Sequence, residues 1–287
     1  TDSGTLAITG ATTLNSGSAD LTLDDAASTF GALAITGANV AVTENAAMDL
    51  GASTISGTAS FNSTSNAITD SGTLAITGAT TLNSGSADLT LDQSASAFGT
   101  LAITGANVAV TENAAMDLGA STISGTASFN STSNAITDSG TLAITGATTL
   151  NSGSADITLN EAASTFGTLA ITGTNVAVTE NAAMDLGAST ISGTASFNSS
   201  NNAITDSGTL AITGVTTLNS GSADLTLDEA ASTFGALAIT GANVAVTENA
   251  AMDLGASTIS GTASFNSNNN AITERAKQEN TKKNKKK

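Results

Sequence analysis

The side chains best suited to acid–base or metal chemistry in this sequence are carboxylates that return at fixed intervals. Between positions 1 and 68 they are Asp20, Asp24, Asp25, Glu44 and Asp49, and most of the set recurs in the following stretches. Glycoside-cleaving enzymes use a pair of carboxyl groups, one as the acid and one as the base or nucleophile. Carboxylate oxygens are also the ligands that Ca²⁺ prefers.

The groups that would assist such chemistry are missing from most of the chain. The sequence has no His, Cys, Trp or Tyr, and its seven Lys and Arg residues all lie after position 274. No aromatic side chain of the sugar-stacking kind and no nearby cation can therefore help the carboxylates bind a sugar or stabilise developing charge. Asp24-Asp25 also lacks the glycine-rich nonapeptide of calcium-binding β-rolls. We expect no enzyme activity, no cofactor and no catalytic or metal-binding residue, and we interpret the acids as a solubilising surface.

The charge distribution excludes other classes of partner. Of the 24 acidic residues only Glu279 lies among the basic residues, so 24 − 1 = 23 carboxylates precede the first cation, Arg275. Binding to phosphates depends on Lys and Arg, so we expect no nucleic-acid function. No apolar run approaches the roughly 20 residues that cross a bilayer, so we expect no membrane insertion. Residues 273–287 are predicted to be a basic, disordered tail, either solvated or bound to an anionic partner.

A recurring hydroxyl group offers a different kind of chemistry. Thr9 and Thr36 each follow an isoleucine, and a column of outward hydroxyls could order water as it does in ice-binding solenoids. Ice binding requires a second parallel column, and the neighbouring outward positions read Ala7, Ala34 and Thr54. Hydroxyl pairing within a sheet explains the column without ice binding.

The elements that must position these side chains are organised around the tripeptide Ile-Thr/Ser-Gly, which occurs twelve times. Its spacings run 27, 20 and 21 and then repeat, as in a parallel β-solenoid where each strand stacks on the next coil. The predicted ladder consists of Ile8, Ile35, Ile55, Ile76, Ile103, Ile123, Ile144, Ile171, Ile191, Ile212, Ile239 and Ile259, together with glycines such as Gly10, Gly37 and Gly57.

A longer string defines the repeating unit. The string Thr-Asp-Ser-Gly begins at positions 1, 69, 137 and 205, which divides the solenoid 1–272 into repeats 1–68, 69–136, 137–204 and 205–272. Each repeat holds nine short strand-like runs, so we expect three strands per coil, about three coils per repeat and about twelve coils in all. The chain enters in mid-repeat, which predicts a trimmed start or a longer precursor.

Local patterns support strands over helices. Leu6 and Ile8, or Val40 and Val42, alternate with polar residues in period two, which places them on one inward face. Turn formers such as Asn15-Ser16-Gly17 separate the runs. The glycine after each isoleucine is expected to turn a corner with a positive φ. The sequence therefore predicts an all-β, right-handed parallel β-solenoid.

The strings 67–78 (AITDSGTLAITG), 80–91 (TTLNSGSADLTL) and 118–125 (LGASTISG) resemble repeats of bacterial filamentous-haemagglutinin-like exoproteins and β-strand-repeat adhesins. The resemblance covers residues 1–272, without the family's amino-terminal secretion domain. It implies a right-handed parallel β-helix that is exported and acts as an adhesin or surface fibre.

These observations predict an extracellular, non-catalytic structural or adhesive rod at a bacterial cell surface. An alternative is a filament subunit that stacks end to end, since a solenoid without caps leaves unpaired strand edges. A polysaccharide-processing β-helix enzyme and an ice-binding protein are further alternatives, and thermal hysteresis tests the last. The expected partners are other copies of the chain or the surface of a host or neighbouring cell.

Overall fold

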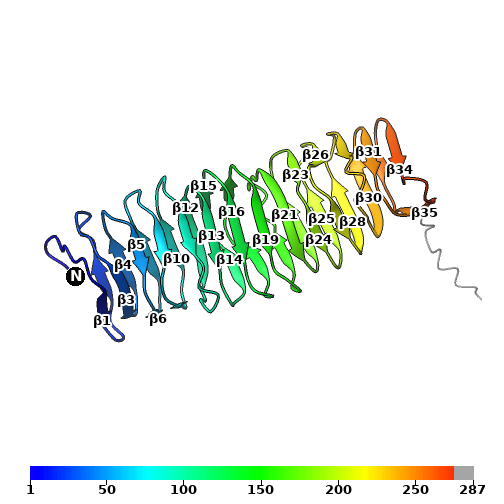
Figure 1. Cartoon of the computed structure of the whole chain (residues 1–287). Helices are drawn as coiled ribbons and strands as arrows, with labels where there is room; N and C mark the ends of the chain where they lie inside the picture. The colour runs from blue at the N-terminus through cyan, green and yellow to red at the C-terminus, as the bar shows by residue number, and fades with distance from the viewer. Residues whose placement is uncertain (275–287) are drawn as a thin grey trace, which may run out of the picture.

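The protein is a rod of stacked β-strands (Figure 1). The computed structural model describes residues 1–274, and these contain 35 strands and no helix. Every strand pairing in this part of the chain is parallel. The predicted all-β parallel β-solenoid is therefore confirmed, with about 13 coils where about twelve were expected. With no helix in the described residues, none of them forms a helix that could cross a membrane.

Two parallel sheets run the length of the rod, and the chain crosses each of them once per coil. The first sheet has 18 strands. They are β1 (Thr12–Asn15), β3 (Ala32–Gly37), β5 (Met48–Leu50), β6 (Ser53–Ile55), β8 (Ile68–Asp70), β9 (Leu74–Ile76), β11 (Leu89–Leu91), β13 (Val108–Thr111), β16 (Ala127–Asn130), β19 (Thr148–Asn151), β21 (Thr168–Gly173), β23 (Met184–Leu186), β24 (Ser189–Ile191), β26 (Ile204–Asp206), β27 (Leu210–Ile212), β29 (Leu225–Leu227), β31 (Val244–Thr247) and β34 (Ala263–Asn266).

The second sheet contains the remaining strands. They are β2 (Leu21–Leu23), β4 (Val40–Thr43), β7 (Ala59–Asn62), β10 (Thr80–Asn83), β12 (Thr100–Gly105), β14 (Met116–Leu118), β15 (Ser121–Ile123), β17 (Ile136–Asp138), β18 (Leu142–Ile144), β20 (Ile157–Leu159), β22 (Val176–Thr179), β25 (Ala195–Asn198), β28 (Val215–Asn219), β30 (Ala236–Gly241), β32 (Met252–Leu254), β33 (Thr258–Ile259) and β35 (Ile272–Glu274).

The number of coils per repeat differs from the prediction. Starting at Met48 in β5, the pairings climb through β8, β11, β13, β16, β19 and β21 and reach β23, which begins at Met184. Met184 is the equivalent of Met48 two repeats later, so seven steps cover two repeats and one repeat makes 7/2 = 3.5 coils. The prediction of three strands per coil was wrong because β5–β6 and β8–β9 are pairs of short strands that share one side of a coil.

The half coil places equivalent residues on opposite sides of the rod. Met48 lies in the first sheet and its equivalent Met116, one repeat later, lies in the second. Met184 is again in the first sheet. Each repeat is thus turned by half a revolution relative to the preceding one.

The predicted isoleucine ladder is consequently broken into short pieces. Ile55 stacks directly on Ile76, but its other neighbour is Gly37, while Ile35 aligns with Ser53 through a bond from the Ile35 N–H to the Ser53 hydroxyl at 3.0 Å. The next group, around Ile123, belongs to the other sheet. The residues do point inward: eleven of the twelve are buried or partly buried, and only Ile8, in the first coil, is 37% exposed.

The interior is narrow and mostly aliphatic, with two phenylalanines per repeat that are all buried except the half-buried Phe265 of the last coil. Leu33, Met48 and Leu50 are completely buried and Phe61 is 1% exposed. Full burial of each such side chain is worth about 1.5–3 kcal/mol, which explains why small alternating residues suffice to hold the coil.

The prediction that the glycines after the isoleucines turn corners with a positive φ was wrong. Positive-φ glycines are confined to Gly17 and its equivalents, in the Asn-Ser-Gly turns. At Gly57 a Cβ would collide with Asn39 Oδ1, and at Gly78 it would lie only 2.5 Å from the carbonyl oxygen of Gly57. These glycines are required because neighbouring coils approach too closely for any side chain.

Candidate functional site

The carboxylates of the first repeat make separate local contacts instead of forming a site. Asp20 accepts hydrogen bonds from the backbone N–H and the side-chain amide of Asn39, at 3.1 and 2.9 Å. Asn39 Oδ1 accepts in turn from the backbone and hydroxyl of Thr58 at 3.0 and 3.1 Å. This Asp–Asn–Thr ladder ties three successive coils together and recurs in each repeat.

The adjacent acids of the long loop are also held by the fold. Asp25 accepts from the N–H of Ala27 at 3.0 Å and from the hydroxyl of Thr5 at 2.9 Å. These two bonds, the first more than the second, lower the pKa of Asp25. The backbone N–H of Asp24 donates to Asp2 Oδ1 at 3.1 Å. The Asp25 carboxylate therefore holds a turn and a contact between coils, whereas Asp24 contacts the neighbouring coil through its backbone.

Asp49 in β5 is half-buried, and its equivalents Asp117 and Asp185 bind hydroxyl groups of neighbouring coils. Asp117 Oδ2 accepts from Thr100 at 2.7 Å and from Ser139 at 2.8 Å. In the first repeat Ala32 replaces Thr100, and Asp49 Oδ1 is buried without a hydrogen-bond partner in the described structure. Among residues 1–274 no three His, Cys, Asp or Glu side chains gather in a way that could hold a metal ion.

Glu44 behaves differently from the other acids because it is fully buried. Its equivalents Glu112, Glu180 and Glu248 are also 0% exposed. In each repeat Oε2 accepts from the backbone N–H of a buried phenylalanine, at 2.8 Å from Phe30 and at 2.9 to 3.0 Å in the later repeats. The other oxygen, Oε1, is buried with no hydrogen-bond partner in the part of the chain that the structure describes.

Burial dominates the electrostatics of these glutamates. Desolvation raises the pKa of Glu44 to about 7 and that of Glu112 and Glu180 to about 8, against the smaller opposing effect of the phenylalanine N–H. The pKa of Glu248 is raised for the same reason. No Lys or Arg side chain lies in residues 1–274 to balance a negative charge, so the protonated form is the one that the interior accepts.

The buried glutamate anchors the loop between β2 and β3. Besides the bond from Phe30, the backbone N–H of Asn45 donates to the Ser28 carbonyl at 2.8 Å. Ser28 Oγ accepts from the N–H of Leu6 in the preceding coil at 3.0 Å. A raised pKa is common at catalytic acids, but a carboxyl group that is 0% exposed cannot reach a substrate. Glu44 and its equivalents are structural.

Sequence reasoning counted Glu44 among the exposed acids and did not anticipate its burial. A signal was present, because Val42 points inward and Thr43 outward, so period two places Glu44 inward again. The alternation thus assigns position 44 to the interior, although an acidic residue is not expected in an apolar interior.

The predicted hydroxyl column is short, and it contains the expected Thr36 but Thr54 in place of Ser56. Thr36 aligns with Thr54, and Thr54 aligns with Ala75. Gly51 and Ala52, between β5 and β6, shift the register so that Ser56 does not face Thr36. The column therefore ends after two coils, and no pair of parallel threonine columns forms there.

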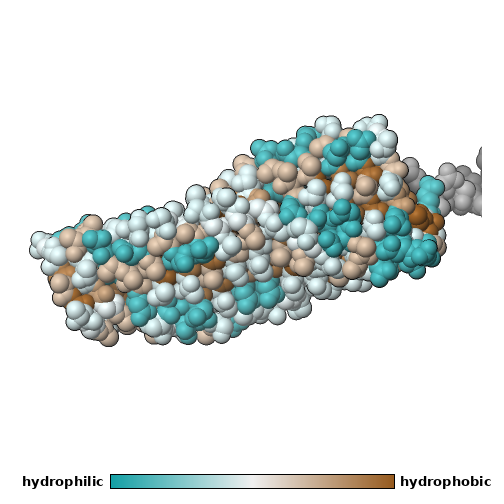
Figure 2. Space-filling view, turned by 45° about the horizontal axis from the view of Figure 1, so that its top comes forward, coloured by the Kyte–Doolittle hydropathy of each residue, from teal (hydrophilic) through white to brown (hydrophobic). Residues whose placement is uncertain are grey.

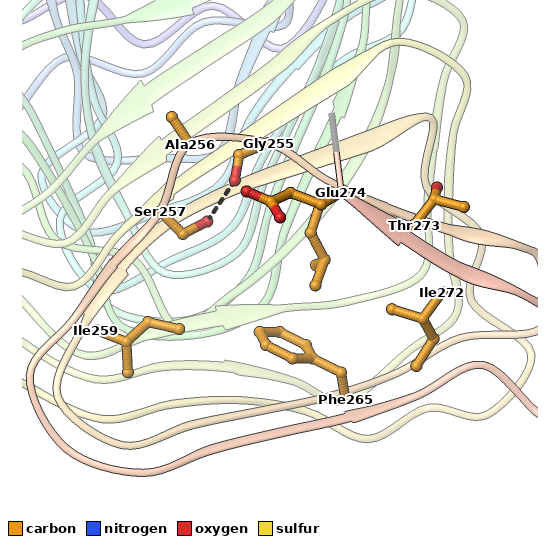
Figure 3. A pocket seen from close by; sticks show the side chains of 9 residues that line it. Gly255, Ala256, Ser257, Ile259, Phe265, Ile272, Thr273 and Glu274 are labelled. Carbon is orange, nitrogen blue, oxygen red and sulfur yellow. Dashed lines mark hydrogen bonds between the residues drawn. The ribbon is translucent and has the colours of Figure 1, made fainter. Parts of the chain in front are cut away.

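The described surface includes a shallow groove and a larger hollow at one end. A shallow groove of about 340 Å³ lies beside β24 and β27. Its lining contains no ionisable side chain and consists of Thr190, Ile191, Ser192, Ala211, Ile212, Thr213, Thr233, Phe234 and Gly235. The larger hollow, about 680 Å³, is the open interior of the last coil (Figure 3). Neither brings together groups suited to acid–base or nucleophilic chemistry.

Comparison with known proteins gives a family for the repeats. Residues 1–36, 37–104, 105–172, 173–240 and 241–278 match a family described as "Repeats of unknown function (DUF5649)". The chain belongs to this family. The matched units have the 68-residue period found above, in a frame that begins at position 37 instead of position 1, and they support a repeat protein. No curated protein and no solved structure matches the chain.

Proposed function

We propose that this DUF5649 repeat chain is a non-catalytic structural rod, a stalk that holds a binding element away from a bacterial cell surface as part of an extracellular adhesin or fibre. The observation that carries the proposal is uniformity. Contacts such as the glutamate–phenylalanine bond and the Asp–Asn–Thr ladder recur in successive repeats with nearly unchanged distances. A catalytic or specific binding site is usually a local irregularity, so contacts that repeat in this way support a structural role.

The physical properties of the rod support this role. Each coil contacts only its neighbours, so length grows by adding repeats without any change in cross-section. About 13 coils at roughly 4.8 Å each give a rod of roughly 60 Å. A net charge of −17 keeps such rods soluble and apart from one another. The resemblance of the repeat strings to bacterial exoproteins supports the extracellular location.

The role as a stalk can be tested by varying the length. The chain is placed between a membrane anchor and a reporter lectin, either complete or with residues 69–204 removed; this deletion takes out two repeats and therefore leaves the direction of the far end unchanged. We expect cells with the longer rod to adhere better to a glycan shielded by a polymer layer. Adhesion that is independent of length, or equally strong adhesion without the lectin, would contradict the role.

The competing enzyme hypothesis has a direct assay. We expect no release of reducing ends when the chain is incubated with acidic or neutral polysaccharides. Release that disappears in the double variant Asp24→Asn/Asp25→Asn, and persists in Asp20→Asn as a control, would replace the structural role with a catalytic one.

A further inference from the structure

The loop 92–99, between β11 and β12, closes over the carboxyl group of Glu112. Hydrophilic residues lie along the visible face of the rod (Figure 2), whereas Glu112 is 0% exposed. Its Oε2 accepts from the Phe98 N–H at 2.9 Å, and its Oε1 is buried with no hydrogen-bond partner in the described part of the chain. β11 pairs with β8 and with β13, so the loop has paired coils on both sides. Water reaches the carboxyl group only when the loop, or the segment that carries Glu112, moves.

The contacts of the loop differ on its two sides. Toward the preceding coil, the Ala97 N–H donates to the Leu74 carbonyl at 2.8 Å, and the Leu74 N–H donates to Ser96 Oγ at 3.0 Å. Toward Glu112, the loop has the bond to the carboxyl group and one bond from the Asn113 N–H to the Ser96 carbonyl at 2.8 Å. Opening on the Glu112 side breaks these two bonds and no bond between strands.

The titratable groups on the elements around Glu112 are all acidic. Asp92 belongs to the loop, Asp70 to the preceding coil and Asp117 to β14, which follows Glu112 in the chain. The following coil, residues 127–134, has no titratable side chain, and the described part of the chain supplies no Lys or Arg. While the loop is closed, an ionised Glu112 would therefore be neither neutralised nor hydrated.

The third repeat contains an independent copy of this arrangement. Glu180 is 0% exposed and its Oε2 accepts from the Phe166 N–H, in the loop 160–167, at 3.0 Å. The acids around it are Glu161 of the loop, whose N–H donates to Asp138 Oδ2 at 3.1 Å, Asp138 of the preceding coil, and Asp185 of β23. The two loops thus provide two separate tests of one device.

We propose that each of these loops takes up one proton when it closes over its glutamate, so that the pH sets how readily the loop opens. The equilibrium is the ionisation of one carboxyl group, which releases its proton to the solvent when the loop is open and binds a proton again on burial. This switch goes beyond the proposed stalk role and does not depend on it.

The direction of the effect follows from burial. Desolvation raises the pKa of Glu112 and of Glu180 from 4.5 to about 8 in the closed loop. Between these values the closed loop keeps a proton that the open loop has lost, so each pH unit favours opening by up to about tenfold. Above about 8 both forms are ionised and the effect levels off.

Hydrogen–deuterium exchange of the complete chain tests the proposal. Peptides that contain 92–99 (DQSASAFG) and 160–167 (NEAASTFG) differ in sequence, so mass spectrometry reports on the two loops separately. After correction for the intrinsic pH dependence of exchange, the protection of both loops should fall between pH 5 and 8 by up to about tenfold per unit. Strand β16 and its equivalents should remain more protected than the loops throughout, because their amides exchange only through more extensive unfolding.

Substitution of one glutamate distinguishes a local switch from a change in overall stability. Glu112→Gln keeps an oxygen for the Phe98 N–H and cannot ionise, so it should abolish the pH dependence in 92–99 and leave it in 160–167. Glu180→Gln should give the reverse pattern, and it takes the place of Glu112→Gln if that variant does not fold. Asp70→Asn is the matched control: burial raises the pKa of this carboxyl group too, and it contacts the same loop, but it should leave the pH dependence unchanged.

Several results would overturn the proposal. One is loop protection that stays constant from pH 5 to 8, and another is exchange of the loops at the same rate as β16. Glutamine variants that keep the fall, or that change both loops alike, would also contradict a local switch. Loss of the pH dependence in Asp70→Asn would assign it to the wrong carboxyl group.

Discussion

At the scale of single residues, the fold accepts four carboxyl groups in a wholly uncharged interior. Each makes one hydrogen bond through Oε2 and leaves Oε1 buried without a partner among residues 1–274. Burial of an unpaired charge costs more than burial of a neutral acid, so protonation of these groups is coupled to folding.

This coupling predicts that stability falls as the pH rises. Below pH 4.5 Glu112 is protonated in both states, and between 4.5 and about 8 the unfolded chain loses the proton that the folded chain keeps. In this window each such group lowers the free energy of unfolding by up to about 1.4 kcal/mol per pH unit. Urea unfolding from pH 5 to 9 should show a decline that Glu112→Gln reduces.

Asp25→Asn is the control for this prediction. The pKa of Asp25 is lowered from 3.8, so its stabilising effect is lost only as the pH falls through that lower value. The substitution should leave the slope between pH 5 and 9 unchanged. A Glu112→Gln variant with the parent's slope would show that the buried glutamate is charged in the folded state.

Because the isoleucines point inward, substitution by aspartate should change the free energy of unfolding very differently at adjacent positions. Ile123 in β15 is 0% exposed, whereas its neighbour Thr122 faces outward. Ile123→Asp should lower the free energy of unfolding by about 3–5 kcal/mol because it buries an unpaired acid in place of a core side chain. Thr122→Asp should change it by less than about 0.5 kcal/mol. Thermal unfolding measures both, and similar values would argue against an interior at this position.

At the scale of elements, a tight turn follows β7 and each equivalent strand. This turn holds two non-glycine residues at positive φ. In the first repeat these are Thr64 and Ser65, with φ of 48° and 74°, and the Asn66 N–H closes the turn on the Ser63 carbonyl at 3.1 Å. The turn is of type I′, which favours Asn and Gly. The corresponding residues change to Ser200-Asn201 and then Asn268-Asn269, which suit the conformation better.

Removing this strain should stabilise the rod. Ser133, with φ of 78°, occupies the same turn in the second repeat. Ser133→Gly should raise the free energy of unfolding by about 0.5–1 kcal/mol because glycine adopts positive φ without steric cost. Ser128→Gly, in the neighbouring strand β16, should lower it by a similar amount. Urea denaturation distinguishes them, and a loss of stability in both variants would count against the turn assignment.

At the scale of the whole molecule, the half-coil rotation means that each loop is displayed alternately on two sides of the rod. Equivalent loops on one side are two repeats, and so seven coils, apart. At roughly 4.8 Å per coil this is a spacing of about 34 Å. A rod with an even number of repeats keeps its two ends in the same orientation, and removal of one repeat turns them by half a revolution.

Distances between spin labels test the rotation, and the absence of native cysteine makes labelling specific. The exposed residues Ala27, Ala95 and Ala163 are equivalent in successive repeats. Labels at Ala27→Cys and Ala163→Cys should give a narrow distribution centred at ~34 Å. The pair Ala27→Cys and Ala95→Cys should exceed its ~17 Å axial separation because the labels lie on opposite sides. Equal steps of ~14 Å along one side would instead indicate three coils per repeat.

The sequence alone determined the all-β solenoid, the 68-residue period and the positions of nearly all strands. It could do so because inward and outward residues alternate with period two, and because stacking of identical repeats requires that alternation to return in register. Of the nine runs expected in the first repeat, only Leu6–Thr9 is not a regular strand and is reduced to the single bridge Ala7–Thr29.

Only the tertiary structure decided how many coils one repeat makes and which residues stack. Sequence spacing counts residues, but the distance around a coil depends on where the chain bends, as at Gly51-Ala52 between β5 and β6. That bend aligns Ile55 with Gly37 instead of Ile35 and accumulates to half a coil per repeat. Alternation marks position 44 as inward, but the closing of the loop from β2 over Glu44, with the Phe30 N–H on its carboxyl group, is a contact that only the tertiary structure shows.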